Sequence, residues 1–377
     1  MRESISYVGL DVHKKFIQAA LIQAGTGDVF EWRTPNTSSK VAALIRKVCK
    51  LGGPRVELCY EAGPTGYDLS RKLNDQEGFR CRVIAPSLIP RKSGERIKTD
   101  RRDAKKLATY LEAGLLTEVQ PPTPEEEGRR ELCRAREAAK QVEKKAKQRL
   151  GKFLLRQGHI YREGKKAWIG MHMRWLERQK FDNAHLQIVF DSFLRALTQA
   201  TDVVRELEQA IEAAAKDDAV REPVELLQCF KGIRVVSAMC IVTELYDIER
   251  FQSPRSLMSF LGLTASEHSS GGAPKRGGIT KAGNARLRRL LIESSWTCTR
   301  SNKTGFAVRK RRDGQPGWAV DLAERAQHRL HRRYWRLVHG GKHSNKAVTA
   351  VAREFAGFIW AMLLNQRLHM LETEVTV

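Results

Sequence analysis

The sequence lacks the features of exported and membrane-spanning proteins. Its longest strongly apolar run near the C-terminus, residues 355–364, has ten residues, whereas a membrane span needs about 20. Glu3 and Asp11 interrupt the segment where a secretory signal would be continuously apolar. The seven cysteines are scattered without a C-x-x-C pair, so neither a zinc knuckle nor a disulfide framework is indicated. We therefore expect a cytoplasmic protein that does not span a membrane.

Acidic residues are also scarce relative to basic ones. The chain has 43 Asp and Glu against 67 Lys and Arg, a formal net charge of +24. Residues 271–350 hold 19 Lys and Arg but only 4 Asp and Glu, so they carry +15 of that charge. The runs RKRR (309–312) and HRLHRRYWR (328–336) place Tyr334 and Trp335 among arginines, which suits phosphate contact and base stacking. This region predicts a polyanion-binding face; a solvated basic helix is the alternative.

The 377 residues exceed one ordinary domain. From Ser4 to about Val119, short β-rich runs alternate with helical ones, which is typical of a mixed α/β layer structure. Gly25 and Gly27 lie between the second and third runs and predict a hairpin, so the first three strands should form an antiparallel meander. The expected strands are 6–12, 16–23, 28–34, 55–61 and 80–86, and the expected helices are 39–51, 66–74 and 103–112.

The middle of the chain is helical and charged. Three prolines and an acidic run over 118–128 predict a linker followed by a helix. Apolar residues then recur in alternating steps of three and four over 132–146 and again over 193–214. These two long helices could pair as a hairpin within the chain or form a dimerising coiled coil. We expect an α/β domain at 1–119, a coiled-coil-like linker region at 120–222 and a mostly α-helical domain at 223–377.

The third region begins near Pro223 with a glycine between two apolar helical runs, LLQCFKGIRVVSAMCIVTEL. This pattern is found where a helix–hairpin–helix offers backbone amides to phosphate, and an ordinary helix turn capped by glycine fits it equally well. The apolar stretch 353–363 should pack on the third domain or on another subunit.

Four acids occupy positions suited to a common site. Asp11 and Glu61 end the first and fourth expected strands, where strands of one sheet can emerge side by side. Asp100 and Asp103 lie three apart at the start of a helix and so share one face of its first turn. Four gathered carboxylates would repel one another unless cations lay between them. Such oxygen ligands suit Mg²⁺ or Mn²⁺, and two ions about 3.5–4 Å apart are usual in phosphodiester displacement.

The strand-D, strand-E and helical D-x-x-D order resembles the RuvC-like, RNase H-type catalytic domain. The blocks CYEAGPTGY, KTDRRDA and GLTASEHSSGGAPKRGGITKAGNARLRRLL (262–291) resemble the transposases of the "one hundred and ten" insertion-sequence family, DEDD recombinases related to the Piv invertase. The resemblance covers the first 115 or so residues and roughly 224–300. It implies that Asp11, Glu61, Asp100 and Asp103 hold the metal ions.

The same resemblance implies a nucleophilic serine that precedes a glycine in the second signature, here Ser270, with Ser269 as the substitute candidate. Serine needs a metal or a base to activate it, and the acids supply that part. His13 and His268 are left out of the predicted site, since an isolated histidine is more often a surface or packing residue. Basic residues expected to hold nucleic acid are Lys275, Arg276, Lys281, Arg286, Arg309, Lys310, Arg311 and Arg312.

These observations together predict a transposase, a site-specific recombinase associated with the nucleoid that cuts and rejoins DNA through the metal-bound acids and Ser270. The resemblance implies a homo-oligomer, a dimer or tetramer, and in some members a structured non-coding guide RNA. A RuvC-like junction resolvase that hydrolyses DNA with water is the second hypothesis. A non-catalytic nucleic-acid scaffold is the third.

Overall fold

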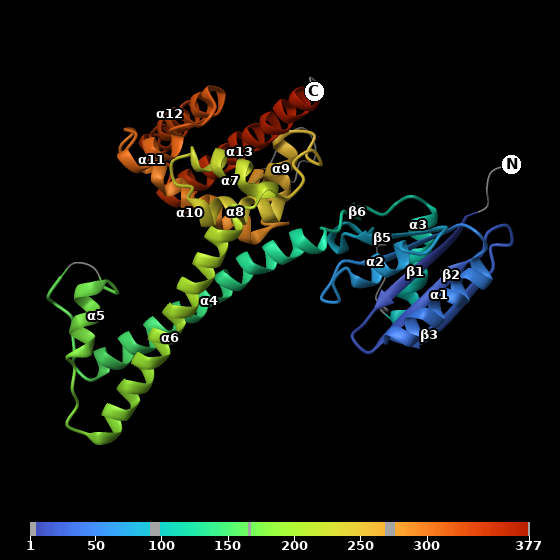
Figure 1. The fold of residues 1–377 in the computed structure, drawn as a ribbon, viewed down its shortest axis with the longest axis horizontal. Helices are drawn as coiled ribbons and strands as arrows, with labels where there is room; N and C mark the ends of the chain where they lie inside the picture. Colours follow the sequence, from blue (N-terminus) through green and yellow to red (C-terminus); the bar gives the residue numbers. More distant parts are fainter. Residues whose placement is uncertain (1–4, 91–98, 165–166, 268–275, 376–377) are drawn as a thin grey trace. The chain divides into compact units, whose positions relative to one another are not determined.

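A computed structural model of the chain describes residues 5–90, 99–164, 167–267 and 276–375. Two compact units are present, residues 1–122 and residues 123–377. The first is an α/β unit and the second is almost entirely helical (Figure 1). The predicted division of the helical part at residue 222 stays a prediction.

The first unit is built on a six-stranded mixed sheet with the order β3-β2-β1-β4-β5-β6. β1, β2 and β3 form the predicted antiparallel meander, β1, β4 and β5 are parallel, and β6 closes the other edge antiparallel to β5. The strands are β1 (Ser6–Val12), β2 (Phe16–Ile22), β3 (Val29–Pro35), β4 (Val56–Glu61), β5 (Phe79–Ile84) and β6 (Glu118–Val119).

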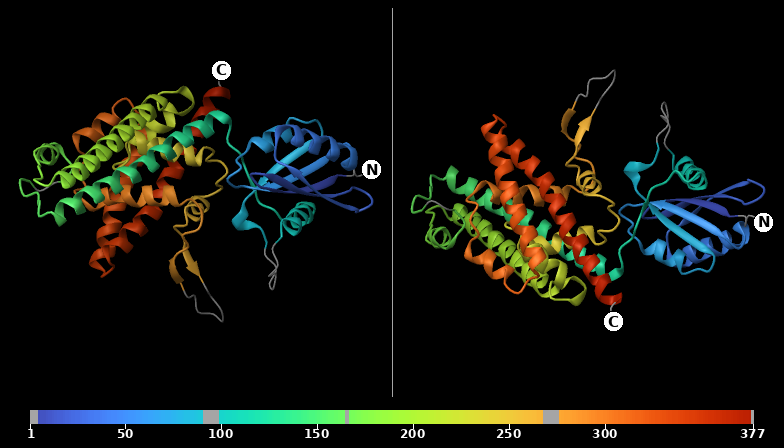
Figure 2. Two further views of the ribbon diagram at one scale, coloured as in Figure 1. Left: turned by 90° about the horizontal axis from the view of Figure 1, so that it is seen from below. Right: turned by 90° about the horizontal axis from the view of Figure 1, so that it is seen from above.

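Helices cover both faces of this sheet. The helices of the first unit are α1 (Ser38–Gly52), α2 (Asp68–Asn74), the short 3₁₀ helix η1 (Pro86–Leu88) and α3 (Asp100–Glu112). Leu58 and Tyr60 of β4 pack in one apolar cluster with α1 and α2, whereas Cys59, between them, packs with Leu107 of α3 in another. Because side chains alternate along a strand, α3 lies on the opposite face of the sheet from α1 and α2 (Figure 2).

The second unit begins with the two long helices that the apolar periodicity predicts. α4 (Pro124–Arg156) starts at a capping box formed by Thr123 and Glu126, and α6 (Ala184–Ala214) packs along it. Arg136 of α4 pairs with Glu208 of α6. The short helix α5 (Gly170–Glu177) joins them at one end, where an apolar cluster is built around Leu150, Phe153 and Phe190. We call this pair of helices with α5 the arm; its coiled-coil role in dimerisation stays a prediction.

The rest of the second unit surrounds one large apolar core. Its elements are α7 (Asp218–Gln228), α8 (Val235–Leu245), α9 (Pro254–Phe260), β7 (Ala265–Glu267), β8 (Arg276–Ile279), α10 (Ala285–Ser295), η2 (Trp296–Thr299), α11 (Phe306–Arg312), α12 (Gly317–His339) and α13 (Ser344–Val375). The predicted glycine turn between two helices is present at Gly232, which joins α7 to α8 at φ 100°. A β-carbon there would lie 2.5 Å from Thr297 Oγ1, so the turn packs closely against η2.

α13 is the most apolar long helix of the described chain. Residues 344–369 are long and apolar enough to cross a membrane, a feature that counting only the uninterrupted run 355–364 misses. Half of the most apolar window is nevertheless buried inside the protein. Val351, Phe355 and Ile359 lie in the core that α13 shares with α7, α9, α10 and α12. This packing explains the helix's composition as that of a core element.

Candidate functional site

The acids of the first unit lie at the carboxyl ends of two neighbouring strands and at the start of α3. β1 and β4 are parallel, and Leu10 is paired with Tyr60. Asp11 and Glu61 follow those two residues and therefore lie on adjacent strands, whose separation is about 4.8 Å. The sheet thus brings these two predicted residues side by side.

Alternation along the strands places both acids on the α3 face. Asp11 shares its face with Gly9, and Glu61 shares its face with Cys59, whose thiol donates to the Leu107 carbonyl of α3 at 3.7 Å. A β-carbon on Gly9 would lie only 2.1 Å from the Ala104 carbonyl oxygen. Glycine at this position therefore allows the close approach of α3 to β1.

The first turn of α3 carries the other two acids. Thr99 caps this helix, its hydroxyl accepting from the Arg102 amide at 3.3 Å. Asp100 and Asp103 lie in the first turn, where the helix dipole favours negative charge. The cap fixes where the helix begins, and so where these carboxylates lie relative to β1.

Three side chains form a compact group that could bind a metal ion. Ligand atoms of Asp11, His13 and Asp100 all lie within 4.8 Å of one another. His13 Nε2 is 3.1 Å from Asp11 Oδ2 and 3.6 Å from Asp100 Oδ1. Among the described residues, Glu61 and Asp103 are outside this group, although both make other interactions. Of the four predicted acids, the structure thus brings Asp11 and Asp100 into one group.

His13 is a site residue that the sequence reasoning left out. It follows Asp11 by two positions, so alternation would have placed both on the same side of the chain. The backbone turn after β1 holds it: the His13 amide donates to the Phe16 carbonyl at 2.9 Å, and Asn36 donates to the His13 carbonyl. Its ring lies against Phe16, with centroids 4.6 Å apart. The spacing D-x-H was the signal available in the sequence.

The electrostatics of the group fit a cation. Burial raises the pKa of the Asp11 carboxyl above its ordinary value; His13 opposes this, while Asp100 and Asp103 raise it further. The ionised acids therefore repel one another in the protein by itself, and a divalent ion between them would remove that repulsion. Carboxylate oxygens suit Mg²⁺ and Mn²⁺, so the residues present fit such an ion.

The second signature forms the base of a β-ribbon that extends from the helices (Figure 2). β7 pairs with β8 antiparallel, with Ala265 opposite Ile279 and Glu267 opposite Arg276. Ser270, its alternative Ser269, His268 and Lys275 lie outside the described residues, as does the side chain of Arg276.

Two glycines of that signature are required by the backbone. Gly262 and Gly283 have φ 63° and 74°. A β-carbon on Gly262 would lie 2.1 Å from the Ala282 carbonyl oxygen, and one on Gly283 would lie 2.0 Å from the Phe260 carbonyl oxygen. The motif therefore fixes the two chain segments that lead into and out of the ribbon. Lys281, between them, is exposed and also has a positive φ of 57°.

A buried ionic network includes Asn284, which follows the chain segment that leads out of the ribbon. Asn284 caps α10, accepting from the Leu287 amide at 3.0 Å, and donates to Glu244 at 2.8 Å. Arg134 of α4 donates to both carboxylate oxygens of Glu244, at 2.7 and 3.1 Å. Burial alone would raise the pKa of Glu244, but the Arg134 guanidinium and the Asn284 amide lower it, and the net shift is downward. Glu244 is therefore held ionised and joins α4, α8 and α10.

The predicted basic residues differ in their availability. Arg309 and Lys310 are exposed on α11, and Arg286 is half-exposed and pairs with Glu137 at 2.6 Å. Arg312, in contrast, is buried and donates to the Cys229 carbonyl at 3.0 Å and to Glu324 at 3.1 Å.

Arg311 is half-buried, and it donates to the carbonyls of Gln228 and Ala307. Arg311 and Arg312 therefore hold the end of α7, and we remove them from the proposed nucleic-acid contacts. Among the aromatic residues of the run 328–336, Tyr334 is buried and so cannot stack on a base, whereas Trp335 is 38% exposed.

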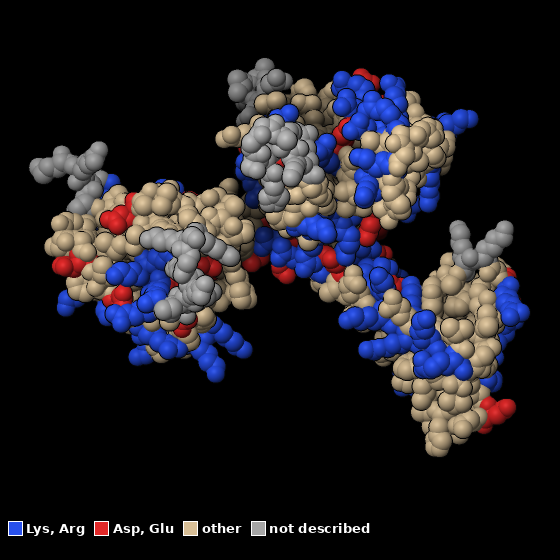
Figure 3. All heavy atoms as spheres, turned by 180° about the vertical axis from the view of Figure 1, so that it is seen from behind, with Lys and Arg blue, Asp and Glu red and all other residues tan. Residues whose placement is uncertain are grey.

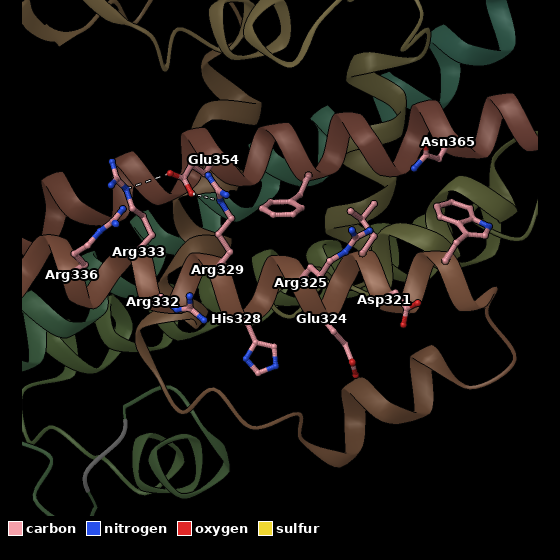
Figure 4. Close-up of a pocket in the computed structure, with 13 residues that line it drawn as sticks. Asp321, Glu324, Arg325, His328, Arg329, Arg332, Arg333, Arg336, Glu354 and Asn365 are labelled. Carbon is pink, nitrogen blue, oxygen red and sulfur yellow. Dashed lines mark hydrogen bonds and ion pairs between the residues drawn. The ribbon is translucent and has the colours of Figure 1, made fainter.

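Five arginines line a groove of about 1150 Å³ between α12 and α13 (Figure 4). The arginines that line it are Arg325, Arg329, Arg332, Arg333 and Arg336. Glu354 of α13 pairs with Arg329 at 3.2 Å and with Arg333 at 3.3 Å. The other three have no acidic partner among the described residues, which leaves an excess of positive charge in the groove.

Comparison with known proteins identifies the family. The family described as "Transposase IS116/IS110/IS902 family" matches residues 224–308, and DEDD_Tnp_IS110, described as "Transposase", matches residues 8–158. "Putative transposase y4qE" of Sinorhizobium fredii is 39% identical over 366 residues, which are 96% of this chain and 89% of that protein. The "Transposase for insertion sequence element IS1533" of Leptospira borgpetersenii is 32% identical over 88% of this chain and 96% of its own length. The chain belongs to the IS116/IS110/IS902 family of transposases.

Proposed function

We propose that this transposase cuts and rejoins DNA at a metal site formed by Asp11, Glu61, Asp100 and Asp103 in a RuvC-like domain. The observation that carries the proposal is the group that Asp11 and Asp100 form with His13. Glu61 lies on the strand next to Asp11, and Asp103 lies in the same helix turn as Asp100. Relatives named as transposases support DNA as the substrate.

Asp11 and Asp100 would hold the ion most directly, with Glu61 and Asp103 beside them. A bound divalent ion supplies a Lewis acid that polarises a phosphoryl oxygen, and two such ions would serve both the attacking and the leaving oxygen. His13 is placed to orient Asp11 through the 3.1 Å contact. Thr99 keeps Asp100 and Asp103 at the helix start.

The proposed nucleophile is Ser270, with Ser269 as the alternative. Its hydroxyl oxygen forms a bond to the DNA phosphorus while a phosphorus–oxygen bond of the DNA backbone breaks. The serine proton passes to a base, and the leaving DNA oxygen takes up a proton. The covalent serine–phosphate link conserves the energy of the broken bond, so the reverse attack by another DNA end can rejoin the strands.

Several further partners are part of the proposal. Lys281, Arg286, Arg309, Lys310 and the arginine groove between α12 and α13 would hold phosphates of the nucleic acid, together with Lys275 and Arg276. A dimer or tetramer would allow the acids of one subunit to meet the serine of another. A structured non-coding RNA would select the DNA sites, as the family resemblance implies.

The test combines purified protein, Mg²⁺, DNA carrying the element's end junction and RNA transcribed from its flanks. We expect a protease-sensitive protein–DNA adduct that is absent in Ser270→Ala and in Asp11→Ala, while Ser269→Ala retains it. If Ser269→Ala loses the adduct and Ser270→Ala retains it, the nucleophile is Ser269. Adduct formation that survives Asp11→Ala would refute the metal site.

A junction resolvase that uses water is the second candidate, because all four acids lie within residues 1–122 and the serine lies elsewhere. Its signature would be free cleaved ends without an adduct, unchanged in Ser270→Ala and abolished in Asp11→Ala.

A further inference from the structure

The arm of the second unit carries a basic surface that the proposed chemistry does not use. From Lys144 to Arg195 the sequence has 13 Lys and Arg against 4 Asp and Glu, an excess of +9 in 52 residues. Lysine and arginine side chains are prominent along the arm in the space-filling view (Figure 3). The periodicity of the arm predicts a helical hairpin or a dimerising coiled coil, and neither of these accounts for the charge.

Charge is distributed unequally along α4. In its first part, the basic residues have acidic partners: Arg134 pairs with Glu244, Arg136 pairs with Glu208 and Lys140 pairs with Glu143. After Glu143, in contrast, the helix has six basic residues and no acid up to its end at Arg156. The internal pairing that stabilises the first part is therefore absent from most of the second.

Four of these residues line one pocket of about 330 Å³ on the arm. Lys145, Arg149, Lys152 and Arg156 recur at steps of four, three and four, which places them in one stripe along the helix. All four are exposed, and none has an ion pair within the described chain. The other two lining residues are Gln148, also on α4, and Phe193, on α6. We call these four cations the arm stripe.

The arm stripe is unfavourable for the protein by itself. Lys145 and Arg149 are like charges four residues apart, as are Lys152 and Arg156, and such pairs destabilise a helix. An anionic ligand with evenly spaced charges would reverse this effect. The stripe runs over the 12 residues from Lys145 to Arg156. Its 11 steps of about 1.5 Å span about 17 Å, which corresponds to about five base-pair steps of 3.4 Å.

We propose that the arm stripe binds the phosphate backbone of duplex DNA, outside the DNA held at the catalytic residues. The chemistry favours duplex DNA over RNA, because single-stranded RNA is bound by stacking of its unpaired bases, and double-stranded RNA by contacts to its 2′-hydroxyls as well as to its phosphates. The pocket offers one amide, Gln148, and one aromatic ring, Phe193, which is already half-buried against Phe153. Cations on a straight helix instead contact phosphates without reading sequence.

The test measures binding of full-length protein to a duplex of about 40 base pairs without the element's sequence, by fluorescence anisotropy over a series of salt concentrations. EDTA is present throughout, so no strand chemistry takes part. This proposal rests on the proposed function only in that DNA is the ligand; failure of strand transfer would not affect the binding result. The stripe variant is Lys145→Gln, Arg149→Gln, Lys152→Gln and Arg156→Gln.

A matched control removes four other exposed cations, each of which already has an acidic partner. It combines Lys72→Gln, Arg178→Gln, Arg205→Gln and Arg221→Gln, whose partners are Asp68, Glu163, Asp202 and Asp218. Both variants lose four positive charges, so a difference between them reports position and not net charge.

We expect the stripe variant to bind DNA on the order of 10-fold or more weakly than the control variant. Its log–log salt slope should be shallower by about 3 to 4, since each phosphate contact contributes about 0.9. Its melting temperature should be unchanged or higher, because like-charge repulsion is removed. The same melting measurement separates lost contacts from misfolding.

Equal affinities and salt slopes for the two variants would overturn the proposal. So would a stripe variant that loses affinity for a structured RNA of similar length but binds the duplex normally, since the arm would then be an RNA-binding element. A melting temperature that falls sharply in the stripe variant would show that the four cations stabilise the fold, and this too would refute the assignment.

Discussion

At the scale of single residues, the surroundings of Asp11 raise the pKa of its carboxyl. It is partly buried, contacts His13 and feels the charges of Asp100 and Asp103. Its raised pKa means that folding favours the protonated carboxyl. The stability that it contributes in the metal-free protein is therefore present at low pH and is lost as pH rises through the folded-state pKa.

Asp11→Asn should therefore leave the metal-free protein as stable as the wild type, or more stable, at pH 7. The difference should shrink as pH falls through the folded-state pKa, where the wild-type carboxyl takes up its proton. Adding Mg²⁺ or Mn²⁺ should raise the melting temperature of the wild type but not of the variant, and strand transfer should fall on the order of 100-fold or more. Thermal unfolding with and without metal checks this, with Asp28→Asn in an exposed turn as the control.

Gly9 is the second residue with a specific requirement. Gly9→Ala would place a β-carbon 2.1 Å from the Ala104 carbonyl oxygen and force α3 away from the sheet. We expect a loss of about 1–3 kcal/mol in unfolding free energy, together with weaker metal binding, because α3 carries Asp100 and Asp103. Urea unfolding and metal titration measure both quantities.

Gly128→Ala is the matched control, since nothing lies within 4 Å of the position that a β-carbon would take there on α4. In a helix this change should stabilise the protein by roughly 0.5–1 kcal/mol. A Gly9→Ala protein with unchanged stability and metal affinity would contradict the role assigned to the close approach of α3.

At the scale of elements, the Glu244 network decides how α4, α8 and α10 are held together. Glu244 is buried, and its lowered pKa means that it contributes stability above its unfolded-state value of about 4.5. That contribution should be lost as pH falls through the folded-state pKa. Protonation of Glu244 at low pH should therefore both lower the stability of the second unit and weaken the contact to Asn284 at the base of the ribbon.

Glu244→Ala should cost about 1.5–3 kcal/mol at pH 7, because Arg134 loses its buried partner and keeps only Glu131 at 3.1 Å. The difference between the wild type and this variant should shrink at low pH, where the wild-type carboxyl is also protonated. Urea unfolding at pH 7 and at about pH 3 checks the sign. Glu212→Ala, on the exposed surface of α6, should change neither value by more than about 0.5 kcal/mol.

At the scale of the whole molecule, the acids of the proposed metal site and most of the positive charge belong to different units. Residues 1–122 contain 21 Lys and Arg and 14 Asp and Glu, or +7, which leaves +17 for residues 123–377. Metal binding and DNA affinity should therefore be separable, because the second unit can attract phosphates without any metal.

Chelation by EDTA should consequently abolish strand transfer while leaving DNA affinity within about threefold of its value in Mg²⁺-containing buffer of the same ionic strength. Asp11→Ala should behave like the chelated wild type. Anisotropy and strand-transfer assays on the same samples test this, and a parallel loss of binding and chemistry would show that the metal organises the DNA contacts.

The strand and helix pattern, the meander and the positions of the four acids were predictable from local features. Alternation, 3.6-residue periodicity and turn glycines act over a few residues, and they correctly placed β1 to β5 and the long helices α4 and α6. The excess of positive charge is likewise a property of composition. Family membership followed from motifs written in short stretches of sequence.

Only the tertiary structure decided which side chains meet. It showed that His13, which the D-x-H spacing only places on the same side of the chain as Asp11, also reaches Asp100 of α3. It also buried Arg312 and Tyr334 within runs of basic residues that the sequence predicted to be available for nucleic acid. It also showed which cations of α4 have acidic partners, such as Arg134, and which line the pocket of the arm stripe. Local patterns determine the elements, whereas contacts between residues distant in sequence depend on how those elements pack, because burial and ion pairing are properties of the assembled surfaces.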